Sequence, residues 1–391
     1  MLEGSRSSSN GTRVEVDLTH MKSQNLPYSL FPGQIVAVEG VNTSGRKLIA
    51  HRICDGAAHP APKSTVGELL QFHHDDSHQG GNPLKIMAAA GPFTSAENLD
   101  YEPFFDLLNE TVQEGPDVVI LMGPFVDMRH KSIASGGPVL KFENDDGDLI
   151  VSNEMIFKEK IAALLQDLFE NDATLHTHVV LVPSLNDATA EWVYPQAPFT
   201  DKRPGGGMRS DFLGEAGFSL GSHGLYEINT KSDQRIHCVS NPCTLKINEV
   251  TVGITATDAV MHMSGNEISS HNLQGSRLAR LMQHMLQQRS YCPLFPAPIN
   301  LNLQRADQWK IPCGLDLLLA PSKLVPFARP VLEGETLAIN PGELTKDTIG
   351  GTYAIIDVHP MTRETLDAAG GPQVELQHTI AERATVSIKK I

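Results

Sequence analysis

The alternation of apolar and polar residues changes character about one fifth of the way along the chain. Before that point, apolar residues alternate with polar ones in short runs that Gly-containing turns separate, which is typical of β-strands. The predicted strands of this first part are Arg13–Leu18, Gln34–Glu39 and Lys47–Cys54. Short strands joined by such turns favour a small β-barrel.

From residue 84 onward, apolar runs of strand length alternate with longer stretches of helical period. The predicted helices of this part are Leu99–Val112, Asn153–Phe169 and Leu273–Gln288. The predicted strands are Lys85–Ala90, Val118–Met122, Val179–Val182, Ile236–Val239, Thr244–Ile247, Val250–Thr255 and Leu315–Ala320. This α/β order predicts a sheet covered by helices.

Two stretches have little periodicity. Residues 57–83 are rich in Pro, Gly and polar residues and predict a loop, which divides the chain into units 1–80 and 81–391. The cluster His73, His74, Asp75, Asp76 and His78 lies there. Its residue types suit a metal ion, but a solvated loop is the favoured interpretation. The second stretch, residues 194–224, predicts a long loop that is either functional or disordered.

Composition places the protein among ordinary globular chains of two domains, with 391 residues, of which 40% are hydrophobic and 20% charged. No apolar run is long enough to span a bilayer, and the polar N-terminus lacks the apolar region of a signal peptide. We therefore expect an intracellular protein without a membrane partner. The five cysteines are widely spread and form no Cys-x-x-Cys pair, so neither zinc nor a disulfide is expected.

The charge balance bears on nucleic-acid binding. Lys and Arg number 31 against 46 Asp and Glu, which leaves a net charge of -15. Such a surface repels the phosphate backbone of DNA, so we expect DNA contact to be weak or to go through a partner protein. The basic residues Lys202, Arg203 and Arg209, between Phe199 and Phe212, are the local exception.

Candidate chemistry is expected in the loops that follow the carboxyl ends of strands, because open α/β sheets build their sites there. Four such loops are found at 88–93, 123–127, 182–187 and 320–324. Their order and local sequence resemble the metal-binding loops of the calcineurin-like metallophosphoesterases, which carry Asp-x-His, Gly-Asp-x-x-Asp, Gly-Asn-His-Asp/Glu and Gly-His-x-His.

The resemblance is one of position and not of metal ligands. Residues that cannot bind a metal, or that differ from the expected ligand, stand at most ligand positions: Ala88, Ala90, Pro124, Leu185 and Asn186. The fourth loop has no histidine, and only Asp127 and Asp187 remain. Two-metal hydrolysis requires several carboxylates and imidazoles around two ions about 3.5 to 4 Å apart. The sequence therefore predicts a protein without metal, cofactor or catalytic activity.

A closer resemblance concerns four segments spread over most of the chain. The segments 28–34, 45–48, 117–127 and 340–346 with 350–352 are similar to the accessory B-subunit family of DNA polymerase alpha-primase. The resemblance implies a degenerate calcineurin-like phosphoesterase β-sandwich with flanking helices, preceded by an OB-fold β-barrel. Only three or four of the five OB strands are found, so the barrel is expected to be partial at its N-terminus.

The same resemblance implies a non-catalytic scaffold in the nucleus that supports replication initiation and primer synthesis. Its implied partner is the C-terminal zinc-containing domain of the polymerase alpha catalytic subunit, with primase reached indirectly. The residues themselves leave two alternatives open. One is an active phosphoesterase or nuclease that takes ligands from His223, His237, His262 or His271. The other is a single-stranded DNA-binding protein that uses the OB face.

Overall fold

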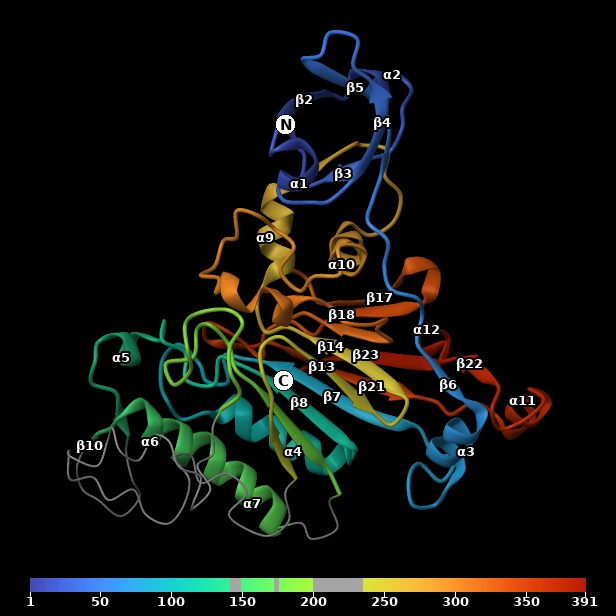
Figure 1. Ribbon diagram of the computed structural model, residues 1–391. Coiled ribbons are helices and arrows are strands. Elements are labelled where there is room, and N and C mark those ends of the chain that lie inside the picture. Colours follow the sequence, from blue (N-terminus) through green and yellow to red (C-terminus); the bar gives the residue numbers. More distant parts are fainter. Residues whose placement is uncertain (141–148, 172–175, 200–234) are drawn as a thin grey trace.

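The structure, a computed structural model, describes residues 1–140, 149–171, 176–199 and 235–391. The predicted basic segment with Lys202, Arg203 and Arg209, and also Phe212 and His223, lies outside these residues. A small N-terminal β unit stands on a larger body that is built around two packed sheets (Figure 1). Within the described residues, no helix has the length and apolar character needed to cross a membrane.

The N-terminal unit is a four-stranded sheet with a small core of its own. Its strands are, in spatial order, β1 (Leu2–Glu3), β2 (Arg13–Asp17), β5 (Lys47–Cys54) and β4 (Ala37–Val41). Short helices α1 (Arg6–Ser9) and α2 (Thr19–Ser23) join the strands. Met21, Tyr28 and Ala50 are buried between them. The predicted strands are confirmed, with β4 beginning three residues later than expected.

The larger body contains a six-stranded and a five-stranded sheet. The first has the order β12 (Ile236–Cys238), β11 (His178–Val182), β8 (Val118–Met122), β7 (Leu84–Ala90), β21 (Thr352–Val358) and β23 (Ala384–Lys390). The second has the order β13 (Cys243–Ile247), β14 (Val250–Ile254), β16 (Leu317–Leu319), β18 (Thr336–Asn340) and β17 (Phe327–Val331). Strands β7, β8, β11 and β12 are parallel to one another.

Alternating residues of β7 divide the core into two layers. Ile86 and Ala88 face the five-stranded sheet, where they pack with residues such as Val252 and Leu319. Met87 and its neighbours on the other face pack against the helices that cover the six-stranded sheet. These helices are α4 (Glu102–Glu114), α6 (Asn153–Phe157), a π-helix (Lys158–Ala162) and α7 (Ala163–Asn171). The predicted sheet with flanking helices is thus found, and a second sheet packs on it, as in the β-sandwich that the resemblance implied.

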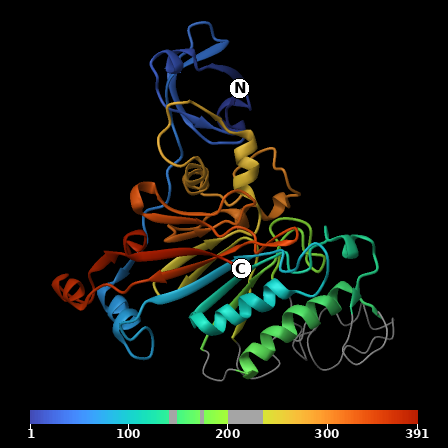
Figure 2. The same ribbon diagram turned by 180° about the vertical axis from the view of Figure 1, so that it is seen from behind.

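Helices α9 (Ala259–Asn266) and α10 (Arg277–Gln287) cover the outer face of the five-stranded sheet and lie beneath the N-terminal unit (Figure 2). Strand β3 (Ser29–Leu30) of that unit pairs with β15 (Ile268–Ser269), which lies between the two helices in sequence. The buried Ser29 hydroxyl donates to Glu267 at 2.7 Å and accepts from His284 Nε2 at 2.9 Å. A buried polar chain therefore joins the two parts.

The remaining elements are short and mostly lie at the rim. They are β6 (Lys63–Thr65), α3 (Val66–His74), α5 (Lys131–Ala134), β9 (Val139–Leu140), β10 (Leu149–Ile150), a 3-10 helix (Leu303–Trp309), a 3-10 turn (Leu332–Gly334), β19 (Thr345–Lys346), β20 (Ile349–Gly350), α11 (Arg363–Ala368), β22 (Glu375–Gln377) and α12 (Ile380–Arg383).

The prediction of a continuous loop over residues 57–83 is wrong. Strand β6 pairs with β22, and helix α3 begins with a capping box in which Thr65 and Glu68 hydrogen-bond to each other's backbone N–H. A solvated loop was the favoured interpretation of the His and Asp cluster, and it is also wrong for His73. The His73 side chain is fully buried, and its Nε2 lies 2.7 Å from Glu249 Oε1. These partners are distant in sequence, and a local pattern does not reveal them. The division into units 1–80 and 81–391 stays a prediction.

Candidate functional site

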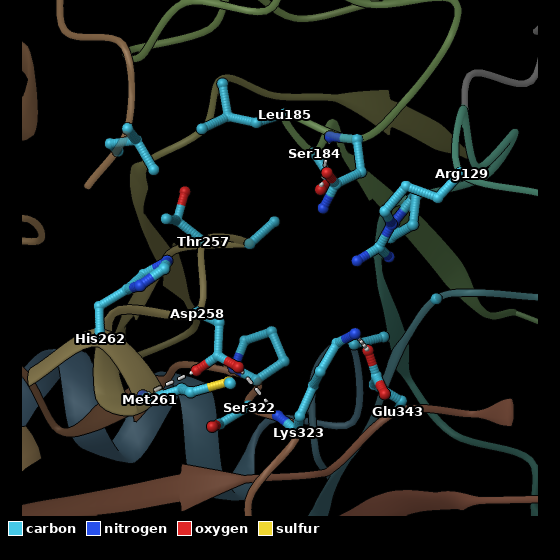
Figure 3. Close-up of a pocket in the computed structure, with 18 residues that line it drawn as sticks. Arg129, Ser184, Leu185, Thr257, Asp258, Met261, His262, Ser322, Lys323 and Glu343 are labelled. Atoms are coloured by element: carbon cyan, nitrogen blue, oxygen red, sulfur yellow. Dashed lines mark hydrogen bonds and ion pairs between the residues drawn. The ribbon is translucent and has the colours of Figure 1, made fainter. Parts of the chain in front are cut away.

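A cleft of about 350 Å³ lies where the carboxyl ends of the parallel strands meet (Figure 3). The loops after β7, β8 and β11 of one sheet form one side. The loops after β14 and β16 of the other sheet form the opposite side, together with the first turn of α9. The four predicted loops are thus brought together, as the rule for strand ends in α/β sheets leads one to expect.

The predicted site residues divide between this cleft and the core. Ala90, Pro124, Leu185 and Asn186 line the cleft. Ala88 is completely buried between the two sheets instead. The carbon atoms of Ala90, Pro124 and Leu185 therefore line the cleft at positions predicted for metal ligands, and carbon atoms cannot bind a metal ion.

Two glycines let the loops after β7, β8 and β11 touch one another at the backbone. A Cβ atom at Gly91 would lie 2.1 Å from the carbonyl oxygen of Pro124. A Cβ atom at Gly123 would lie 2.2 Å from Asp187 Oδ2 and 2.9 Å from the Ser184 nitrogen. Real Cβ atoms do not approach so closely, so both contacts require glycine. The peptide bond after each of these glycines is cis.

Asp187 fastens the loop after β8 to the loop after β11. Its side chain is fully buried and accepts backbone N–H groups from Phe125, Val126 at 3.1 Å and Ser184 at 2.8 Å. Burial raises the pKa of Asp187 to about 7, against the lowering effect of these three donors. Its oxygens are therefore occupied by the protein itself.

Asp127 is engaged as well. Its carboxylate forms a bidentate pair with Arg129, with Nε at 3.0 Å from Oδ1 and Nη2 at 2.9 Å from Oδ2. Its backbone forms an isolated β-bridge with that of Asp187. The two carboxylates that remain of the metal-binding pattern thus hold loops in place.

The histidines considered as alternative ligands are not brought together. His262 lines the cleft, whereas His237 on β12 stacks on His178 at 5.2 Å between ring centroids. His271 is exposed, and His223 lies outside the described residues. Among the residues that the structure describes, no three His, Cys, Asp or Glu side chains gather in a way that could hold a metal ion.

On the side of the cleft that the five-stranded sheet provides, sequence reasoning found the loop 320–324 but missed Asp258 and Glu343. Asp258 caps α9 by accepting the Met261 N–H at 2.9 Å, and its second oxygen accepts the Lys323 N–H at 3.0 Å. The Lys323 ammonium lies 4.0 Å from Glu343, and burial raises the pKa of Glu343. Asp258 closely follows the predicted strand Val250–Thr255, so the strand-end rule could have found it.

Two family models match the chain, in the parts that hold the N-terminal sheet and most of the cleft. One, described as the B subunit of DNA polymerases alpha and epsilon, matches residues 86–329, which is more than half of the chain. The chain belongs to this B-subunit family. The other model, described as the OB domain of the DNA polymerase alpha B subunit, matches residues 1–56, which hold the N-terminal sheet. The predicted family is therefore confirmed.

Relatives within the B-subunit family are similar over most of this chain. The DNA polymerase alpha B subunit of Rattus norvegicus is 32% identical over 90% of the chain and 50% of the relative. The protein of the same name from Bos taurus is 34% identical over 84% and 46%. That from Schizosaccharomyces pombe is 30% identical over 92% and 56%. The chain spans about half the length of these relatives.

Proposed function

We propose that this chain is a non-catalytic accessory subunit of the DNA polymerase alpha-primase complex. In this proposal it binds the C-terminal zinc-containing domain of the polymerase alpha catalytic subunit and reaches primase indirectly. It would thereby support replication initiation and primer synthesis in the nucleus. The names of the relatives support the accessory role. The net charge of -15 supports contact with DNA through partners rather than directly.

The observation that supports the proposal most directly is the set of residues found in the strand-end cleft. Alanine, proline and leucine stand at predicted ligand positions, and both remaining aspartates, Asp127 and Asp187, are engaged in bonds within the protein. We therefore assign the larger body to a degenerate calcineurin-like phosphoesterase fold. Without a set of metal ligands the cleft lacks what two-metal hydrolysis requires, which supports a scaffold role without catalysis.

The two units have distinct places in this proposal. Residues 1–80 comprise the OB unit with its following β6 and α3, and residues 81–391 comprise the phosphoesterase-like unit. Both β6 and α3 contact the larger body, since β6 pairs with β22 and α3 packs on α11. Ser29 and Glu267 add a buried hydrogen bond across the contact between the units. Such contacts keep the units together as one surface for a partner.

The lack of catalysis is tested by incubating the purified chain with bis(p-nitrophenyl) phosphate and Mn²⁺ or Mg²⁺. We expect no release of nitrophenol above that of the buffer, and no difference between the wild type and an Asp127→Asn variant. Metal-dependent hydrolysis that Asp127→Asn abolishes would overturn the proposal in favour of an active phosphoesterase. A variant of the exposed Asp307, Asp307→Asn, controls for the loss of one carboxylate.

A further inference from the structure

Strand β23 forms one edge of the six-stranded sheet, where within the described residues it pairs with β21 alone. It is seven residues long and is the longest of the strands described at the edges of the two large sheets. In Figure 2 this strand, drawn in red, lies in front of the larger body, and no helix is drawn across it. An edge strand presents a row of backbone N–H and C=O groups to whatever lies beside it.

The register with β21 shows which backbone groups of β23 face away from the sheet. Just beyond one end of the strand, the Ile391 N–H donates to the Gly351 carbonyl at 3.1 Å. Just before the other end, the Arg383 carbonyl accepts from the His359 N–H at 2.9 Å. Hydrogen-bonded residues alternate with non-hydrogen-bonded ones in an antiparallel pair. The odd-numbered residues of β23 therefore bond to β21, and the even-numbered ones direct their backbone groups outward.

The outward-facing edge of β23 is open. Among the residues that the structure describes, the N–H groups of Val386, Ile388 and Lys390 have no hydrogen-bond partner. Strand β17, an edge of the five-stranded sheet, contains Pro330, which has no N–H and blunts that edge. Strand β23 contains no proline, and its lysines are its last two residues. Its outward backbone groups are thus free to pair with another strand.

The side chains of β23 indicate what kind of strand fits beside it. Val386 and Ile388 are partly buried and pack against the core between the two sheets. Thr385 and Ser387 are exposed on the opposite face. Lys390 is exposed and has no ion pair within the described parts of the chain. Because directly opposite side chains of neighbouring strands contact each other, the fitting strand alternates apolar and small polar residues and carries a carboxylate opposite Lys390.

We propose that β23 binds an extended peptide segment of another protein, which adds an antiparallel strand to the edge of the six-stranded sheet. Antiparallel pairing is slightly more stable per residue than parallel pairing. In this orientation the carboxylate lies at the N-terminal end of the peptide, opposite Lys390. A second copy of this chain fits less well, because two chains of net charge -15 repel each other. The proposal is independent of the polymerase partner proposed above.

The experiment is fluorescence anisotropy of the peptide Glu-Thr-Val-Thr-Val-Thr-Val, labelled with fluorescein at its C-terminus and titrated with the whole chain. We expect saturable binding. Ile388→Pro and Ile388→Ala both shorten the side chain, but only proline removes the outward N–H, and the bonds to β21 stay intact in both variants. Ile388→Pro should therefore bind about twofold to tenfold more weakly than Ile388→Ala, as the loss of one hydrogen bond predicts. Equal affinities of the two variants, or absence of saturable binding, would overturn the proposal.

A second pair of measurements tests the charge and does not require a proline variant to fold. Lys390→Met should weaken binding about twofold to fivefold, as the loss of an exposed ion pair predicts. The same peptide with lysine in place of glutamate should bind the wild type more weakly. Equally tight binding of both peptides would overturn the assigned orientation. Circular dichroism shows whether each variant is folded.

Hydrogen exchange, resolved by residue in NMR spectra, tests the open edge directly. The Val386 and Ile388 amides should exchange fast in the free chain and become protected when the glutamate peptide is bound. Slow exchange of both amides in the free monomer would show that the edge is already covered, which contradicts the proposal. Sedimentation of the free chain should show a monomer. A dimer that Ile388→Pro dissociates would make a second copy the occupant and would also contradict it.

Discussion

The buried charge cluster around Glu249 gives the sharpest test of the structure. Glu249 is fully buried and accepts from His73 at 2.7 Å and from Arg383 Nη2 at 2.7 Å. The backbone N–H of Met361 donates to His73 Nδ1 at 3.2 Å, so the proton of a neutral His73 lies on Nε2 and faces Glu249. Burial by itself raises the pKa of Glu249, but His73 and Arg383 together hold it at about 2.

The substitution Glu249→Gln keeps the shape of the side chain and removes its charge. A pKa of about 2 in place of the usual 4.5 corresponds to about 3 kcal/mol of stability at neutral pH. Because the folded pKa lies below the unfolded one, this contribution is complete above pH 4.5 and is lost as the pH falls toward 2. We therefore expect the variant to be about 3 kcal/mol less stable at pH 7 and the difference to shrink below pH 4.5.

Arg383→Met is the matched change on the other side of the pair. It leaves the carboxylate of Glu249 buried beside His73 alone, and breaking a buried ion pair in this way costs about 3 to 5 kcal/mol. Urea unfolding followed by circular dichroism at pH 7, 5 and 3.5 measures both variants. A loss for Glu249→Gln that is the same at pH 7 and pH 3.5 would refute the assigned charge state. So would an Arg383→Met variant as stable as the wild type.

Three further changes test the loops of the cleft and the contact between the units. Gly123→Ala should cost about 1 to 3 kcal/mol in urea unfolding, because its Cβ would lie 2.2 Å from Asp187 Oδ2, whereas Gly137→Ala has open space and should cost far less. Burial raises the pKa of Asp187 to about 7, so the stability of the wild type relative to that of Asp187→Asn should fall as the pH rises from 4 to 7. A difference in stability that stays constant over this range would contradict this. Ser29→Ala should lower the free energy of unfolding by about 1 to 3 kcal/mol, because Glu267 loses a hydrogen-bond donor. An unchanged free energy of unfolding would contradict the buried hydrogen bond between Ser29 and Glu267.

Strands with a continuous apolar run, or with a clear alternation of apolar and polar residues, could be located from the sequence with little error. Val118–Met122 and Lys47–Cys54 agree with β8 and β5 residue for residue. An apolar run bounded by turn residues is a local signal, and the same signal located the loops that meet at the cleft. The order of strands could not be found in this way. Strand β21 lies beside β7, which is more than 200 residues earlier in the chain, and only tertiary packing decides that pairing.

The candidate site was predicted in position but not in its full composition. Asp127 and Asp187 were found as remnants of a metal-binding pattern, yet their bonds to Arg129 and to backbone N–H groups depend on loop geometry that no spacing rule gives. His73 was misjudged for the related reason that its partner, Glu249, is 176 residues away.

The scaffold role proposed for this chain requires that it hold a polymerase partner without catalysing a reaction itself. Size-exclusion chromatography of the purified chain, mixed with the C-terminal zinc-containing domain of the polymerase alpha catalytic subunit, tests this role. We predict that the two co-elute as one complex and that the Glu249→Gln variant, where it is folded, behaves in the same way. Separate elution of a folded chain and a folded, zinc-loaded partner would contradict the proposed role.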